Sequence, residues 1–309
     1  MTTKGEERAS ILNGLHVIDG GLASELEYLG ARIDGPLWSA HVLEDNPDKV
    51  AAVHRAYIEA GSECIATCSY QVSRMGYAEI GLPPERADAG LLRSVALARS
   101  VTQEFPTRRI LVAASLGPYG AALHNGAEYH GNYDCSFADL IAFHRERIEV
   151  LATAPAAQAP DLLAFETFPS LNEAKAVCAA LEPWPHLQAW LSFTCRDEKT
   201  VAHGEPLRDC AAFLEGTPQI VAIGVNCIPP NWVPALIAEL RAASAKPVMV
   251  YPNSGEGWDA EARAWTGSTD PSAFGPLAKE WFAAGAQIVG GCCRTRPAHI
   301  RQVANAAAS

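Results

Sequence analysis

The chain has 309 residues, of which 49% are hydrophobic and 19% charged, and its formal net charge at pH 7 is −11. This composition is that of a globular protein with ample material for a core, and the length allows one large domain or two smaller ones. The acidic balance, and the lack of any run rich in Lys or Arg, argue against a nucleic-acid partner.

The first residues of the chain do not have the character of a targeting segment. Residues 1–8 are polar and of mixed charge, so they lack the apolar core of a signal peptide, and we expect residues 1–10 to be flexible. No stretch approaches the ~20 apolar residues of a membrane span, so no membrane partner is expected. The nine cysteines are an odd number, in a chain too large to need disulfides. We therefore predict a cytoplasmic protein whose cysteines are thiols or metal ligands.

Short apolar runs alternate with longer helical patterns along the whole chain. Eight such runs are present, and the sequence leaves room for a helix between consecutive ones. They are residues 15–18, 64–67, 110–114, 162–165, 189–193, 220–223, 247–250 and 287–289. Nearly continuous apolar strands separated by helices are typical of a parallel sheet whose outer face is covered.

Several of the intervening helices have recognisable start and stop signals. Asn46 stands before a proline, which is a favourable pair for a helix start, and the helical pattern that follows closes at Gly61. The segment from Ser170 to Glu173 has the form of a capping box, in which both side chains bond to backbone N–H groups. Gly285 is expected to end the helix before the last strand.

Eight strand–helix units in 309 residues predict an α/β fold, a single (β/α)8 barrel of the TIM type. The alternative is a doubly wound sheet, which usually carries a glycine-rich nucleotide-binding loop after an early strand. Residues 19–22 are too short for such a loop, and no phosphate-binding G-x-x-x-x-G-K-[ST] motif is present. No linker or low-complexity tract divides the chain, so we expect residues 1–309 to form one domain.

In a barrel of this type, the chemistry lies at the carboxyl ends of the strands. Asp19 directly follows the first apolar run and Glu166 the fourth, while Cys227 follows the sixth and Cys292 and Cys293 follow the eighth. Only one strand separates the sixth from the eighth around a closed ring. We therefore expect Cys227 to lie within reach of the adjacent cysteine pair.

The adjacent cysteines follow two glycines, and this arrangement suggests a metal site. Neighbouring side chains on a strand point to opposite faces, so Cys292 and Cys293 can converge only where the backbone bends, and Gly290 and Gly291 allow that bend. With Cys227 they would supply three thiolates and no histidine, a ligand set suited to Zn²⁺ with one position left open. The alternatives are small buried hydrophobic cysteines, which is how we interpret the other six, or a strained vicinal disulfide.

The charge of such a centre indicates a type of reaction. Zn²⁺ with three thiolates carries a net charge of −1 and activates water poorly, but it can hold a fourth thiol as a nucleophilic thiolate near neutral pH. This favours alkyl transfer to a substrate thiol over hydrolysis. Asp19 and Glu166 could capture a substrate ammonium group, or they could cap helices and brace loops.

Four motifs together resemble the homocysteine S-methyltransferase family. They are residues 19–21, 166–167, 224–227 and 290–295, and the resemblance runs from about residue 12 to residue 300. It implies a zinc site formed by the three cysteines, with the homocysteine sulfur as fourth ligand. It also implies that Asp19 and Glu166 bind the homocysteine amino group, with Gly20 and Asn226 as further substrate-binding residues. The glycines after Asp19 would let backbone N–H groups approach the substrate carboxylate.

Further segments are most similar to the branch of that family that uses S-methylmethionine or S-adenosylmethionine. These segments are residues 37–40, 66–71, 115–120 and 251–256, and 309 residues leave no room for folate and cobalamin modules. Aromatic faces should hold the sulfonium cation, and the candidates are Trp38, Tyr70, Tyr251, Trp258 and Trp265. The expected partners are therefore two small molecules, homocysteine and a sulfonium methyl donor, bound by a monomer or small homo-oligomer.

Two alternatives to this reaction stay open. The first is the same chemistry with another donor or acceptor, such as betaine or selenohomocysteine. The second is a zinc-binding or redox-responsive barrel without turnover, which could release its metal when the cysteine pair is oxidised. Such a sensor has no use for Asp19 and Glu166 at the mouth of the barrel.

Overall fold

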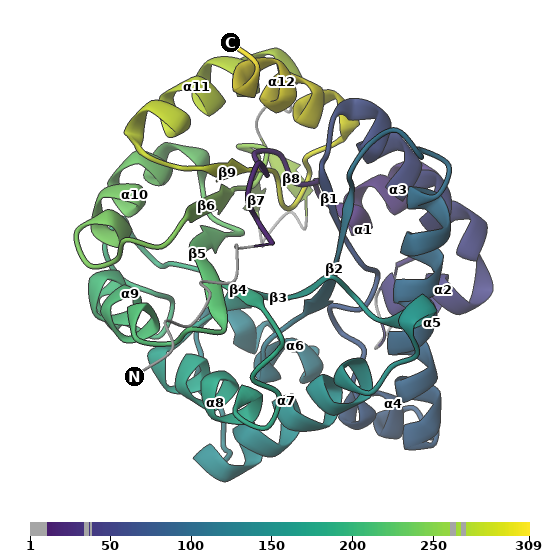
Figure 1. Cartoon of the computed structure of the whole chain (residues 1–309). Helices are drawn as coiled ribbons and strands as arrows, with labels where there is room; N and C mark the ends of the chain where they lie inside the picture. Colours follow the sequence, from purple (N-terminus) through teal and green to yellow (C-terminus); the bar gives the residue numbers. More distant parts are fainter. Residues whose placement is uncertain (1–10, 34–36, 38, 260–263, 267–269) are drawn as a thin grey trace, which may run out of the picture.

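The computed structural model describes residues 11–33, 37, 39–259, 264–266 and 270–309, with the backbone alone at 257–259 and 264–266. Seven parallel strands form one sheet in which the spatial order follows the chain order. They are β1 (Cys64–Ala66), β2 (Leu111–Leu116), β3 (Leu162–Phe168), β4 (Ala189–Phe193), β5 (Ile220–Asn226), β6 (Val248–Tyr251) and β9 (Ile288–Val289). The sheet curls into a ring with the helices outside it, as Figure 1 shows.

Residues 17 and 18 close this ring in place of a full first strand. Val17 forms a parallel bridge with Val289 and Ile18 forms one with Cys64, so these two residues join β9 to β1. The Glu63 carboxylate accepts hydrogen bonds from the backbone N–H groups of His16 and Val17, at 2.7 and 3.0 Å. A side chain therefore replaces the strand partner there. The barrel prediction is confirmed, but the strand expected at residues 15–18 is shorter than predicted.

Helices and short connecting elements surround the ring and lie over its ends. The α-helices are α1 (Leu22–Tyr28), α2 (Ser39–Asp45), α3 (Pro47–Ala60), α4 (Arg74–Glu79), α5 (Pro84–Thr102), α6 (Tyr119–Ala122), α7 (Phe137–Ala152), α8 (Leu171–Leu181), α9 (Leu207–Glu215), α10 (Val233–Arg241), α11 (Phe274–Ala284) and α12 (Pro297–Ala307). The 3-10 turns are η1 (Ala127–Tyr129), η2 (Ala156–Gln158), η3 (Pro230–Trp232) and η4 (Pro271–Ala273). An antiparallel pair, β7 (Gly257–Asp259) and β8 (Ala264–Thr266), follows β6. None of the described helices has the length and apolar character needed to cross a membrane.

Alternating strand residues divide the apolar core into two layers. On β2, Leu111 and Ala113 belong to the cluster inside the ring, whereas Val112 and Ala114 belong to the cluster between the sheet and the helices. This alternation follows from the period of two in a strand. The predicted helix ends at Gly61 and Gly285 are confirmed, since both residues adopt left-handed conformations, with φ of 117° and 115°.

The predicted capping box at α8 is only half formed. Ser170 Oγ accepts a hydrogen bond from the Glu173 N–H at 3.2 Å, but the Glu173 carboxylate turns into the protein. It meets His144 Nε2 at 2.9 Å and the Tyr133 hydroxyl at 2.8 Å. Arg147 donates to His144 Nδ1 at 2.8 Å, and because a guanidinium only donates, His144 must carry its hydrogen on Nε2. This buried network joins α7 and α8 to the segment that follows β2.

His54 on α3 makes the stability of the fold dependent on pH. Its side chain is fully buried, and neither ring nitrogen has a hydrogen-bond partner within the described residues. Burial lowers the pKa of His54 to about 4. As the pH falls, the unfolded chain binds a proton near 6.5, whereas folded His54 stays neutral until about pH 4. The unfolding free energy should therefore fall by about 3 kcal/mol from this residue between pH 7 and pH 4.

Urea unfolding at pH 7 and pH 5 measures this effect. In the His54→Leu variant, the slope of the unfolding free energy against pH should decrease by an amount that corresponds to about one bound proton. The exposed control His186→Gln should keep the wild-type slope. An unchanged pH dependence in His54→Leu would show that the imidazole is not held neutral by burial.

Candidate active site

The residues expected at the strand ends meet in one cavity. It has a volume of about 350 Å³ and is lined by Asp19 and Gly20 beyond Ile18, by Glu166 on β3, and by Asn226 and Cys227 at the end of β5. Cys292 lines it from the segment after β9. The cavity therefore lies at the carboxyl ends of the strands, where chemistry is found in barrels of this kind.

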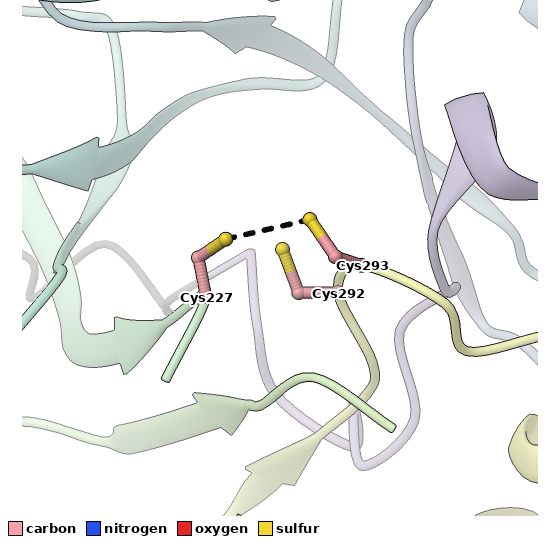
Figure 2. A group of neighbouring side chains, drawn as sticks. All are labelled: Cys227, Cys292 and Cys293. Carbon is pink, nitrogen blue, oxygen red and sulfur yellow. Dashed lines mark hydrogen bonds between the residues drawn. The ribbon is translucent and has the colours of Figure 1, made fainter. Parts of the chain in front are cut away.

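The three cysteine side chains point toward one another at this end of the barrel, as Figure 2 shows. Their sulfur atoms all lie within 4.8 Å of one another, and Cys227 Sγ lies 3.5 Å from Cys293 Sγ. Tetrahedral zinc with Zn–S bonds of about 2.3 Å holds its sulfurs about 3.8 Å apart. Among the described residues, these form the one group of three potential metal ligands. Their number, softness and spacing fit Zn²⁺.

The local backbone explains how adjacent cysteines converge. Positive φ angles occur at Cys227 (55°) and Arg294 (66°), not at the glycine pair before Cys292. The glycines are needed for space instead: a Cβ on Gly290 would lie 2.3 Å from Ile18 Cγ1, and one on Gly291 would lie 2.3 Å from Thr295 Oγ1. The glycines thus allow close packing beside the cysteines, and the left-handed residues of this region are Cys227 and Arg294.

The pKa values of the three thiols are shifted in different directions. Hydrogen bonds from Cys292 and Cys293 hold the pKa of Cys227 well below its usual range. The same contact with Cys227 raises the pKa of Cys292 and that of Cys293. The Tyr129 hydroxyl lies 3.4 Å from Cys227 Sγ and supports its thiolate. The protein alone thus favours one thiolate at the centre of the group, which is the form that binds metals.

Asn226 connects this group to the strands beneath it. Its Oδ1 accepts hydrogen bonds from Thr167 N and Ser192 Oγ, both at 2.8 Å. Its Nδ2 donates to Thr167 Oγ1 at 2.8 Å and to Cys292 Sγ at 3.8 Å. Asn226 lines the cavity as expected, but its amide is already bonded to protein groups. Through these bonds the amide holds Thr167 in a left-handed conformation (φ 64°) and orients the Cys292 sulfur.

Asp19 and Glu166 are two carboxyl groups beside the cysteines, and Asp19 is buried whereas Glu166 is half-buried. Asp19 Oδ2 accepts a hydrogen bond from Ala66 N at 2.8 Å, and Glu166 Oε2 accepts one from Ser115 Oγ at 2.5 Å. Burial raises the pKa of Asp19 well above its usual range, and the Glu166 charge adds to this. Burial also raises the pKa of Glu166 to about 7. Within the described part of the chain, neither carboxylate forms an ion pair with a Lys or Arg side chain. A bound cation would relieve this unfavourable burial.

The glycines after Asp19 differ in their roles. Gly20 lines the cavity, and a Cβ there would lie 2.8 Å from Tyr57 Cε1. The Gly21 N–H donates to Thr295 Oγ1 at 3.1 Å, so a protein group already uses it. Gly21 lines the cavity as well.

No role was predicted for several cavity residues, and three of them are polar residues close to the thiols or to α6. Tyr129 and Glu128 lie on η1, and Gln71 lies in the segment after β1. Gln71 belongs to the segment 66–71 that resembles the family, but no role was predicted for it. Glu128 and Tyr129 belong to no recognised motif, and the only signal for them was their position in a connection at the catalytic end of a barrel.

The predicted aromatic candidates have different outcomes. Tyr70 and Tyr251 both line the cavity, although Tyr251 is only 3% exposed and accepts a hydrogen bond from Trp190. Trp38 lies outside the described residues, and so do the side chains of Trp258 and Trp265.

Comparison with known proteins identifies the family. The family model described as homocysteine S-methyltransferase matches residues 16–307. The chain belongs to the homocysteine S-methyltransferase family. It is 42% identical over 298 residues to the homocysteine S-methyltransferase YbgG of Bacillus subtilis, covering 94% of this chain and 93% of the relative. It is also 42% identical over 290 residues to a homocysteine S-methyltransferase of Escherichia coli, covering 92% of both chains.

A solved member of the family has the same fold. The metallated form of the homocysteine methyltransferase MmuM from Escherichia coli matches with a TM-score of 0.85 and 39% identity, covering 97% of this chain and 98% of that chain. The predictions of the family and of the barrel fold are therefore confirmed.

Proposed function

We propose that this enzyme transfers a methyl group from a sulfonium amino acid to the thiol of L-homocysteine, giving methionine, with Zn²⁺ bound by Cys227, Cys292 and Cys293. Methyl transfer to homocysteine is the activity of its family, and the donor and the metal are the proposed parts. The observation that carries the proposal is one cavity lined by Cys227, Cys292, Asp19 and Glu166, with Cys293 beside the other two thiols in a single cluster. We further propose that the whole chain acts as one catalytic domain on small molecules of the cytoplasm.

The cavity offers matching groups for each end of homocysteine. Bound Zn²⁺ would lower the pKa of the homocysteine thiol and so supply a thiolate near neutral pH. Asp19 and Glu166 would bind the substrate ammonium group, because Asp19 is a buried and Glu166 a half-buried acceptor and neither has a cationic partner among the described residues. The Gly20 backbone, which lines the same cavity, would face the substrate carboxylate.

The transfer itself requires positioning more than proton movement. The homocysteine sulfur attacks the methyl carbon of the donor, the bond from that carbon to the sulfonium sulfur breaks, and the donor leaves as a neutral thioether. No proton moves at the carbon, so no general base is needed there. The walls of the cavity therefore act mainly by holding the two sulfur atoms in line. Tyr70, which lines the cavity, can face the positive sulfonium before transfer.

The size of the cavity favours a small donor. Its volume of about 350 Å³ lies near the lower end of the range for small-molecule sites. Two amino acids of similar size fit such a space better than homocysteine together with a nucleoside-bearing donor. This supports S-methylmethionine over S-adenosylmethionine.

A donor panel tests this proposal. Zinc-loaded enzyme with homocysteine should form methionine with the highest kcat/KM from S-methylmethionine, less from S-adenosylmethionine, and none from betaine. The size argument predicts a difference of roughly tenfold or more between the two sulfonium donors. Methionine formation is measured by mass spectrometry. If no donor yields methionine, the enzyme assignment is wrong and a non-catalytic zinc protein becomes the better explanation.

A further inference from the structure

A third carboxylate lies in the cavity without a role in the homocysteine site. Glu128 is on η1, in the long connection between β2 and α7, and lines the cavity together with Tyr129. Its Oε2 atom is buried and has no hydrogen-bond partner within the described residues. Glu128 interacts electrostatically with Cys227 and Tyr70, whereas the charged neighbour of Asp19 is Glu166. Glu166 interacts with Cys227 as well, so this thiol has both Glu166 and Glu128 as electrostatic neighbours.

Gln71 is a second unsatisfied acceptor in this part of the cavity. It lies in the segment after β1, and its Nε2 donates to the backbone carbonyl of Ala121 at 3.3 Å. This bond fixes the orientation of the amide and ties the segment to α6. The Gln71 Oε1 atom is buried, and no described residue donates a hydrogen bond to it. Both Gln71 and Glu128 line the cavity.

These two oxygen atoms define the kind of group that would bind them. Both are acceptors, and a buried acceptor without a donor is unfavourable, more so where it is charged. A ligand that satisfies both must bring N–H donors, and one that suits Glu128 should be positively charged. An α-ammonium group has three N–H donors and a positive charge, whereas a sulfonium centre has the charge alone.

We propose that Glu128 and Gln71 form a subsite for the α-ammonium group of the methyl donor, which makes the enzyme selective for sulfonium compounds that are amino acids. This inference rests on the proposed function, because it assigns the second substrate of that reaction. Asp19 and Glu166 serve homocysteine, and Glu128 and Gln71 serve the donor. Donors that lack an amino group, such as 4-(dimethylsulfonio)butanoate, leave both acceptors unsatisfied.

The experiment compares S-methylmethionine with 4-(dimethylsulfonio)butanoate, which has the same sulfonium chain without the amino group. In the Glu128→Gln and Gln71→Met variants, the KM for S-methylmethionine should rise by about tenfold, the expected effect of a lost charge-assisted hydrogen bond. The KM for homocysteine and the kcat/KM for 4-(dimethylsulfonio)butanoate should stay unchanged. The exposed control Glu198→Gln should alter none of these values.

Calorimetric titration of the zinc-loaded protein with S-methylmethionine tests the subsite without turnover. Its affinity should fall by about tenfold in Glu128→Gln at unchanged zinc content and without a loss of Tm. An equal affinity in wild type and Glu128→Gln overturns the subsite. So does a rise in the homocysteine KM instead of the donor KM, because it assigns Glu128 to the other substrate. A wild-type protein that binds S-methylmethionine through Glu128 but forms no methionine supports the subsite and contradicts the proposed reaction.

Discussion

Replacing Cys227, Cys292 or Cys293 with serine is expected to remove the bound zinc and to lower methyl transfer by roughly a thousandfold or more. The three sulfur atoms lie within 4.8 Å of one another, so each contributes one ligand to the same ion. A serine hydroxyl stays protonated near neutral pH and is a poor ligand for a metal that this soft donor set selects. Two remaining thiolates leave the site incomplete, and the substrate thiol loses its activation.

Metal analysis of the purified variants gives the decisive measurement. Wild type should contain one zinc per chain, and each serine variant should contain little. Cys135→Ser is the matched control, because Cys135 lies outside the cluster and should not affect zinc content. Circular dichroism and Tm show whether a variant is folded. Full zinc content in all three variants would contradict the assignment of the metal site.

The positions of these cysteines were predictable because of a rule of topology. Parallel strands in a ring bring their carboxyl ends together. Cys227 follows the sixth predicted strand and Cys292 the eighth, so the two residues had to lie near each other. The same rule placed Asp19 and Glu166 in the cavity. These predictions needed only the order of the strands and the residue that follows each.

Features that depend on particular side-chain contacts were not predictable. Glu63 replaces the strand partner of His16 and Val17, and this shortens the first strand. Glu173 bonds to His144 instead of completing a capping box. Local patterns describe what a segment can do by itself, whereas these carboxylates respond to partners distant in the sequence. Glu128 was missed for a related reason, since it belongs to a connection whose path no periodicity describes.

The Glu166→Gln variant is expected to raise the KM for homocysteine by up to about a hundredfold while zinc content stays unchanged. Glutamine keeps the shape of the side chain and can still accept the hydrogen bond from Ser115, which lies 2.5 Å from Glu166 Oε2. It removes the charge that would hold the substrate ammonium group. Asp19→Asn should have a similar effect, because its carboxylate is also buried beside the cysteines without a cation. The exposed control Glu27→Gln should leave the KM unchanged.

The pH dependence gives this prediction a second readout. Burial raises the pKa of Glu166 to about 7 in the free enzyme, so its carboxylate becomes protonated as the pH falls below 7. Only the ionised form attracts an ammonium group, so kcat/KM for homocysteine should fall below pH 7 in wild type. In Glu166→Gln this fall should be much weaker, because the variant has no charge to lose at that position.

The Glu166→Gln variant should bind homocysteine more weakly than wild type but should be more stable to unfolding. A carboxyl group whose pKa is higher in the folded than in the unfolded chain destabilises the fold once the pH rises above its unfolded value. For Glu166 the pKa rises from 4.5 to about 7, which corresponds to roughly 3 kcal/mol at pH 8. Glu166→Gln should therefore unfold at a higher temperature than wild type at pH 8 when no substrate is bound. A variant that binds homocysteine normally, or that is less stable at pH 8, would show that Glu166 is structural. Higher stability with weaker binding would show instead that the fold tolerates an unpaired buried charge because the substrate neutralises it.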